Sequence, residues 1–83
     1  MLKIEHVSEN GETRLRLSGE LRSAQLEEVR TEIARVSPLV LDVAEVGVVD
    51  LDGVRWLNAC RSVGVKVENC APYIHEWMRQ EEQ

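Results

Sequence analysis

Two aspartates one residue apart, Asp50 and Asp52, stand before Gly53 at the start of a segment with helical spacing. Such a pair could bind a metal ion, act as a catalytic carboxylate pair, cap a helix or mark a regulatory site. A hard cation such as Ca²⁺ takes about six to eight oxygen ligands, often from acids at alternate positions that end in a glutamate. The alternate positions after this pair hold no further carboxylate. The sequence therefore predicts no metal site here.

Cysteines and histidines are the other side chains that could bind a metal or act as nucleophiles. His6, Cys60, Cys70 and His75 form no CxxC or HxxxH motif, and no GxSxG, P-loop or GxGxxG motif occurs. Both cysteines are expected to be structural, and His75 is expected on the exposed side of the last helix. We expect no cofactor and no enzymatic activity. The alternative from another class is a thiol-redox protein that uses Cys60 and Cys70.

Length and charge limit the classes of function further. The 83 residues suit one domain, and 43% hydrophobic with 30% charged residues is typical of an ordered globular protein. A formal net charge of -5 disfavours nucleic acid and anionic lipid as partners. The chain shows neither a signal peptide nor an apolar membrane span. A single domain over 1–83 with a cytoplasmic location and no direct membrane insertion is expected.

The first two elements are predicted by alternation. Apolar and polar residues alternate over 2–7 and 13–19, on either side of Asn10-Gly11. A period of two is typical of a half-buried strand, and Asn-Gly is a strong hairpin turn signal. We therefore expect two antiparallel strands joined by a tight turn.

The pattern changes to helical spacing from Ser23, the expected N-cap, to Ser37, and Pro38 should end this helix. The short apolar run 39–43 is typical of a strand buried on both faces, and it should occupy the centre of the sheet.

The remaining elements complete an α/β fold. A helix is expected over 54–63, a strand over 65–68 and a third helix from Pro72, while the tail 80–83 is expected to fray. The order β-β-α-β-α-β-α predicts a mixed four-stranded sheet with right-handed crossovers and helices over at least one face.

Three segments in order suggest a known family. They are LRLSGEL (15–21), LVLDVAEVGVVDLDG (39–53) and GVKV (64–67). Together they resemble the STAS domain of bacterial anti-sigma factor antagonists. In that family a strand ends in Gly-Glu-Leu before the first helix, and a buried strand leads to an Asp-Ser-Ser-Gly or Asp-Ser-Thr-Gly turn. The resemblance covers residues 13–79 and implies a short, stand-alone STAS-like member.

The chain departs from the family at its regulatory residue. The resemblance places Asp52 where the family has a serine or threonine that a partner kinase phosphorylates, and Leu51 replaces the neighbouring hydroxyl. Residues 43–60 contain no serine or threonine. Asp52 would thus supply one permanent negative charge, and whether it imitates the phosphorylated state or abandons the switch stays open. Family members usually continue with another strand and helix after the third helix, which this sequence lacks.

Helix-end chemistry gives the acids a structural interpretation as well. A helix start exposes unpaired N–H groups and the positive end of the helix dipole, so carboxylates are favoured there. Asp50 is expected to cap the second helix, and Asp52 should lie exposed in its first turn. Asp42, at the end of the buried strand, is expected to accept hydrogen bonds from loop amides.

A partner-binding surface is expected around the loop 47–53 and the helix after it. Trp56 should lie away from the core stripe of that helix, and tryptophan and arginine are frequent interaction hot spots. The alternative is that Trp56 covers the sheet edge or the next helix. Tyr73 and Trp77 are instead expected to pack in the core. The proposed surface comprises Gly47, Val48, Asp50, Leu51, Asp52, Gly53, Arg55, Trp56 and Asn58.

The function implied by the resemblance is a non-catalytic regulatory module in bacterial transcription regulation. Its protein partner would be an anti-sigma factor or another kinase-like ATPase. An accessory subunit of a membrane transporter ATPase complex is the alternative within the binding class. The sequence also leaves open whether the chain forms a homodimer.

Overall fold

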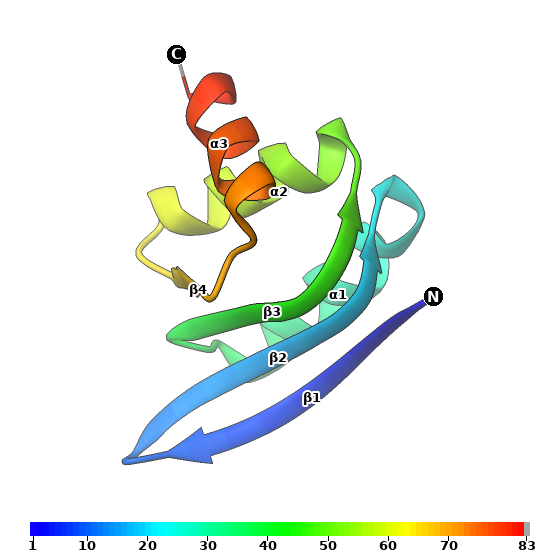
Figure 1. Cartoon of the computed structure of the whole chain (residues 1–83). Helices are drawn as coiled ribbons and strands as arrows, with labels where there is room; N and C mark the ends of the chain where they lie inside the picture. The colour runs from blue at the N-terminus through cyan, green and yellow to red at the C-terminus, as the bar shows by residue number, and fades with distance from the viewer. Residues whose placement is uncertain (83) are drawn as a thin grey trace.

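The computed structural model describes residues 1–82 and contains seven elements over them, in the predicted order β-β-α-β-α-β-α (Figure 1). The α/β class and the mixed four-stranded sheet are also confirmed. The elements are β1 (Leu2–Glu9), β2 (Glu12–Leu21), α1 (Ser23–Val36), β3 (Val40–Val49), α2 (Leu51–Ser62), β4 (Lys66–Glu68) and α3 (Pro72–Glu81).

The strands lie in the sheet in the order of the sequence, β1-β2-β3-β4. β1 and β2 are antiparallel, and β3 pairs in parallel with both β2 and β4. Asn10 and Gly11 join the hairpin with φ values of 52° and 79°. Two positive φ values are the requirement of a type I′ turn, which explains the Asn-Gly pair.

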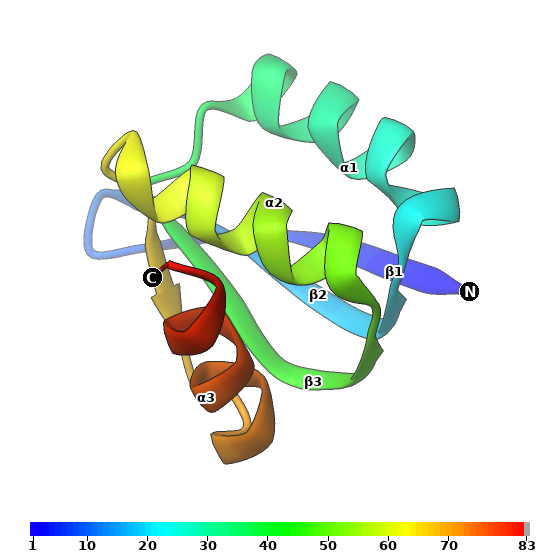
Figure 2. The same cartoon turned by 90° about the horizontal axis from the view of Figure 1, so that it is seen from above.

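The core lies between one face of the sheet and the helices α1 and α2, which Figure 2 shows on the same side of the sheet. Alternate residues of β2 and β3 point into it, because successive side chains of a strand face opposite sides. Leu15, Leu17, Leu41 and Leu57 have no exposed surface. α3 packs against α2 beside β4, and its Ile74 is also fully buried.

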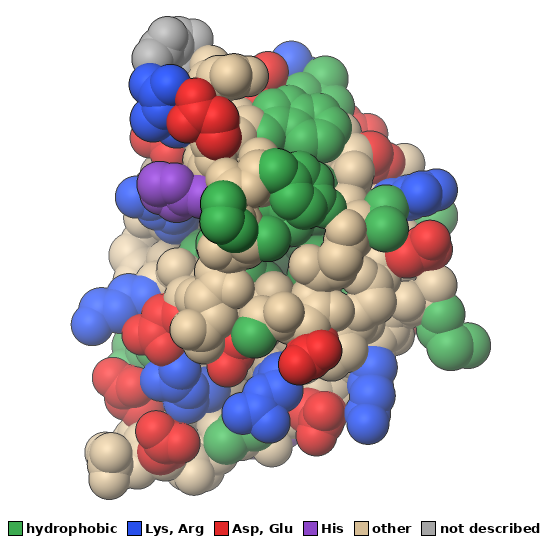
Figure 3. All heavy atoms as spheres, in the orientation of Figure 1, with side chains coloured by type: hydrophobic (Ala, Val, Ile, Leu, Met, Phe, Trp, Pro, Cys, Tyr) green, Lys and Arg blue, Asp and Glu red, His purple; other side chains and the backbone are tan. Residues whose placement is uncertain are grey.

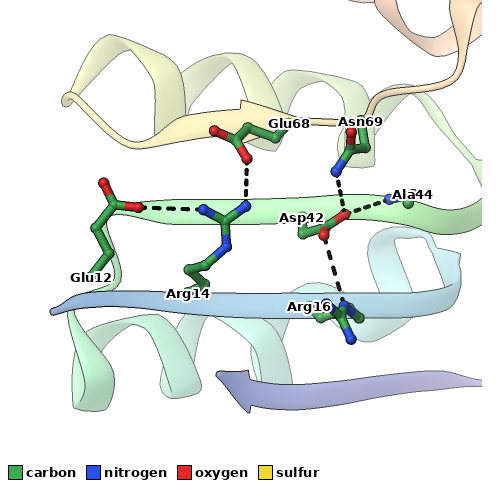
Figure 4. Close-up of polar contacts among 7 residues, drawn as sticks. All are labelled: Glu12, Arg14, Arg16, Asp42, Ala44, Glu68 and Asn69. Atoms are coloured by element: carbon green, nitrogen blue, oxygen red, sulfur yellow. Dashed lines mark hydrogen bonds and ion pairs between the residues drawn. The ribbon is translucent and has the colours of Figure 1, made fainter. Parts of the chain in front are cut away.

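The other face of the sheet carries charged side chains. Figure 3 shows Lys or Arg and Asp or Glu side chains interspersed over this face, and Figure 4 shows the pairs that they form between strands. Arg14 of β2 contacts Glu68 of β4 as well as Glu12 on its own strand. Arg14 thus bridges β2 and β4 across β3, and Arg16 pairs with Asp42 of the neighbouring β3 at 3.7 Å. Opposite charges on neighbouring strands stabilise a sheet.

Two predicted boundaries were wrong. The expected loop 47–53 does not exist, because β3 continues to Val49 and α2 begins at Leu51. The second half of β3 pairs with Ser18–Leu21 of β2 across two shifts in register, and this pairing extends the strand beyond its buried run. Asp50 alone separates strand from helix.

The tail 80–83, which is expected to fray, begins within α3. Residues 80 and 81 belong to this helix. Arg55 of α2 pairs with Glu81, and Arg61 pairs with Glu82. Position 83 lies outside the described residues. Among the helices of residues 1–82, none is both long enough and apolar enough to cross a membrane.

Candidate functional site

The start of α2 is held by one carboxylate that binds two helices. Oδ1 of Asp50 accepts the amide of Gly53 in α2, and Oδ2 accepts the amide of Ser23 at the start of α1, both at 2.9 Å. The hydrogen bond from Ser23, with that from Gly53, lowers the pKa of Asp50. Asp50 is thus the expected cap of α2, and it also joins α1, which sequence spacing did not predict.

Ser23 itself was expected to cap α1, and that prediction was wrong. The N-cap is Arg22, and its amide donates to the side-chain Oε1 of Gln25 at 3.1 Å. Ser23 is instead the first helical residue, whose free amide is available to Asp50. The first turn of a helix always exposes such amides, so the acid of another segment can take the place of a local cap.

Gly53 fixes the distance between α2 and the end of β2. A Cβ atom at this position would lie 2.2 Å from the carbonyl oxygen of Leu21. This separation is far inside van der Waals contact, so only glycine allows α2 to approach the strand this closely. The glycine of the Asp50–Gly53 turn is therefore a packing requirement of this fold.

The outer side of the same turn is open to solvent. Leu51 is 37% exposed and the side chain of Asp52 is exposed. Within residues 1–82 the carboxylate of Asp52 makes no hydrogen bond or ion pair. A carboxylate at this position is favoured by the helix dipole without being bound by any neighbour. Asp52 is therefore available to an external group.

Further apolar side chains lie near this turn. Val48 of β3 is 37% exposed, and Tyr73 of α3 is 52% exposed, with its hydroxyl donating to the carbonyl of Gly47. Figure 3 shows hydrophobic side chains gathered over α3, above the charged part of the sheet. We call the exposed Leu51 and Asp52 the outer surface of the site, and Val48 and Tyr73 are exposed at the adjoining end of β3. Tyr73 was predicted to lie in the core, and that prediction was wrong.

Of the two environments expected for Trp56, a partner surface or a packing position, the structure shows the second. Trp56 is only 7% exposed and belongs to the hydrophobic core. The reason is that α2 is packed on more than one side, by the sheet and by both other helices. An open groove between α1 and α2 is lined by Leu26, Arg30, Asp52 and the edge of Trp56. Trp56 therefore contributes packing, and only a small part of it reaches the surface.

Asn58 was also assigned to the partner surface, and it too faces inward. Its Nδ2 donates to the carbonyl oxygen of Met78 in α3 at 2.9 Å, while its Oδ1 is buried with no partner in residues 1–82. Arg55 remains largely exposed and pairs with Glu81 at 3.2 Å. Both residues therefore hold α3 against α2. Trp77 is partly buried against the core, in line with its predicted packing role.

The two cysteines differ from the two histidines in burial. Burial raises the pKa of Cys60 to about 11 and also raises the pKa of Cys70. Reactive cysteines are thiolates near neutral pH, so Cys60 is chemically quiet. His6 and His75 are both exposed. In the described part of the chain, no three His, Cys, Asp or Glu side chains are grouped as metal ligands.

Asp42 is a third carboxylate with inward contacts. Its Oδ1 accepts the amide of Ala44 at 3.0 Å and the side chain of Asn69 at 3.2 Å, as Figure 4 shows. Burial alone would raise its pKa, but these hydrogen bonds and the charges of Arg16 and Arg14 lower it. Asp42 thus ties β3 to the loop after β4, close to the amide-binding role that was expected.

Comparison with known proteins adds no identification. The chain matches no protein-family model and no curated protein sequence. The resemblance to the STAS domain therefore stays a prediction from three sequence segments.

Proposed function

We propose that the protein is a non-catalytic regulatory module that binds another protein through the outer surface at the start of α2. The proposal rests on one observation: Asp52 carries an exposed, unengaged charge beside the exposed Leu51, on a turn whose inner side is fixed by Asp50 and Gly53. A fixed backbone that presents one charge and apolar area loses little conformational freedom when a partner binds. This is an arrangement suited to recognition.

The resemblance to STAS domains supports the class of partner. It suggests an anti-sigma factor or another kinase-like ATPase, in a cytoplasmic setting. Asp52 then occupies the position that is phosphorylated in the family, and its single permanent charge replaces the reversible phosphorylation. The transporter-subunit alternative uses the same surface and differs only in the partner recovered.

The chemistry of the other candidate groups supports binding over catalysis. The pKa of Cys60 is raised to about 11 by burial, which opposes a thiol-redox role. Asp42 and Asp50 have lowered pKa values because hydrogen-bond donors surround them. A general acid or base needs a pKa near the working pH, so neither aspartate suits proton transfer.

Affinity capture from cells that produce the protein tests the proposal. Wild type and Asp52→Lys serve as bait, with Glu28→Lys as the matched control. Glu28 is an exposed acid of α1, so its reversal changes the net charge equally at another place. We expect wild type and Glu28→Lys to recover the same partner and Asp52→Lys to lose it. Recovery by all three baits would contradict the assignment of the surface.

The identity of the captured protein separates the two partner classes. A kinase-like ATPase without a membrane component supports the anti-sigma factor interpretation, whereas a permease with its ATPase supports the transporter alternative. Titration of the purified partner against Asp52→Ser then tests the role of the permanent charge. Equal affinities of Asp52→Ser and wild type would contradict the view that Asp52 sets the binding state.

A further inference from the structure

The sheet ends at β1, and no other strand of residues 1–82 covers its outer edge. β1 spans eight residues without a proline, and it pairs with β2 in one unbroken register. Figure 1 shows this strand lying at the border of the sheet along its whole length. A long, regular edge offers a row of unpaired backbone donors and acceptors to a further strand.

The backbone groups that face outward can be identified. The carbonyl of Met1 accepts the amide of Glu20 at 3.2 Å, so the polar groups of residue 1 point toward β2. In an antiparallel pair, these groups alternate in direction along the strand. Those of Leu2, Ile4 and His6 therefore point away from β2 and are available at the edge.

The side chains of β1 complement a second copy of the same strand. Lys3 and Glu5 lie on the charged face of the sheet, with 3.7 Å between Nζ and Oε1, and Ile4 lies on the other face against the core. Consider two antiparallel copies with Ile4 opposite Ile4. Lys3 of each copy then lies directly opposite Glu5 of the other. The contact has two opposite-charge pairs on one face and an isoleucine pair on the other.

The next register toward the end of the strand loses this match. A shift that centres the axis on Glu5 places the two Glu5 side chains opposite each other and sets Lys3 against Val7. Like charges directly opposite are destabilising, whereas opposite charges and paired β-branched residues are favourable. The register centred on Ile4 also pairs the outward backbone groups of Leu2 with those of His6.

We propose that β1 is a dimerisation edge: two copies pair antiparallel through β1 about a two-fold axis at Ile4 and join their sheets into one. Such a contact uses the same surface on both copies, so it closes at two and leaves no free β1 edge. The edge lies apart from the outer surface at the start of α2, and this inference does not depend on the proposed function.

Sedimentation equilibrium of the full chain, from about 1 μM to about 1 mM, measures the dimer dissociation constant. Wild type is expected to show a monomer–dimer equilibrium. Glu5→Lys sets lysines opposite each other in both pairs and is expected to weaken the dimer about tenfold. Lys3→Glu combined with Glu5→Lys restores opposite charges and is expected to return the constant to within about twofold.

Glu9→Lys is the matched control, because it changes the net charge equally on the same strand but lies beyond the paired residues. Its dissociation constant should equal that of wild type. A wild type that stays monomeric at about 1 mM overturns the proposal. Equal weakening by Glu5→Lys and Glu9→Lys, or no weakening by either, overturns it too.

An isotope-filtered NOE experiment on wild type tests the register without any substitution. Lys3 and Glu5 of the second copy form a non-hydrogen-bonded pair, in which opposed Cα atoms lie about 4.5 Å apart. We therefore expect an intermolecular NOE between their Hα atoms. An NOE from Lys3 to Val7 of the second copy, or none from Lys3 to Glu5, overturns the proposed contact.

Discussion

The inner and outer sides of the first turns of α2 differ in burial and in their contacts with the rest of the protein. On the inner side, Asp50 and Gly53 contact α1 and β2, and Trp56 packs in the core. On the outer side, Leu51 and Asp52 are exposed. The difference shows that one short turn can hold three elements together on one side and present exposed side chains on the other.

If this division is correct, substitutions on the inner side should lower the free energy of unfolding more than those on the outer side. Trp56→Ala should have the largest effect. Removal of a buried aromatic side chain typically costs about 3–5 kcal/mol. We expect a loss in this range in the free energy of unfolding, measured by urea denaturation. Arg55→Ala, on the exposed flank, is the control and should cost less than about 1 kcal/mol. Similar losses for the two variants would contradict the assignment of Trp56 to the core.

Gly53→Ala tests the close approach of α2 to the end of β2. Alanine is the better helix former by about 1 kcal/mol, but its Cβ would meet the carbonyl of Leu21 at 2.2 Å. Overpacking of this kind typically costs about 1–3 kcal/mol, so after the gain in helix propensity we expect a net loss of about 1 kcal/mol. Thermal unfolding followed by circular dichroism measures it. Gly47→Ala is the matched control, because no atom lies within 4 Å of its new Cβ. A stabilised Gly53→Ala would show that α2 can move away from β2.

Asp50→Asn tests the charge of the carboxylate that connects α1 and α2. The folded pKa of Asp50 is lowered, so its stabilising contribution is full above the unfolded pKa of about 4 and is lost as the pH falls through the folded pKa. We expect the variant to lose about 1 kcal/mol near pH 7, because asparagine keeps one acceptor oxygen and its Nδ2 cannot accept the second amide. Urea denaturation between pH 7 and pH 2 should also give a shallower loss of stability than in wild type. An unchanged pH profile would contradict the double contact of this carboxylate.

Asp52→Asn should have the smallest effect on folding, because the side chain is exposed and makes no hydrogen bond or ion pair within residues 1–82. Surface substitutions of this kind usually stay within about 0.5 kcal/mol. The same urea series measures the change, with Asp50→Asn as the reference. A loss as large as that of Asp50→Asn would mean that the outer side is also structural and would remove the contrast between the two sides.

The fold could be predicted because its signals are local. Alternation, the Asn10-Gly11 turn and the apolar run 39–43 each depend on neighbouring residues only, and all three correspond to the observed hairpin and central strand. The cap at Asp50 is local as well. Asp52 was expected in the exposed first turn, and it lies there.

The errors and the alternatives left open occur where distant elements decide the environment. Trp56 is buried because α1 and α3 flank α2, and Tyr73 is exposed because α3 presents it beside Gly47. Helical spacing does not say which helix will pack on which side. The contact of Ser23 with Asp50 has no sequence signal either, because it joins the starts of two helices 27 residues apart.

The order of the strands has a consequence for how the chain folds. Each strand pairs with the one before it in the sequence, so every closed loop contains one turn or one helix with its connections. The entropic cost of closing a loop grows with its length, so the tight turn at Asn10 and Gly11 is the cheapest of these closures. The β1–β2 hairpin can form first and extend one strand at a time. A ribosome that releases the chain from its N-terminus would deliver these elements in the same order.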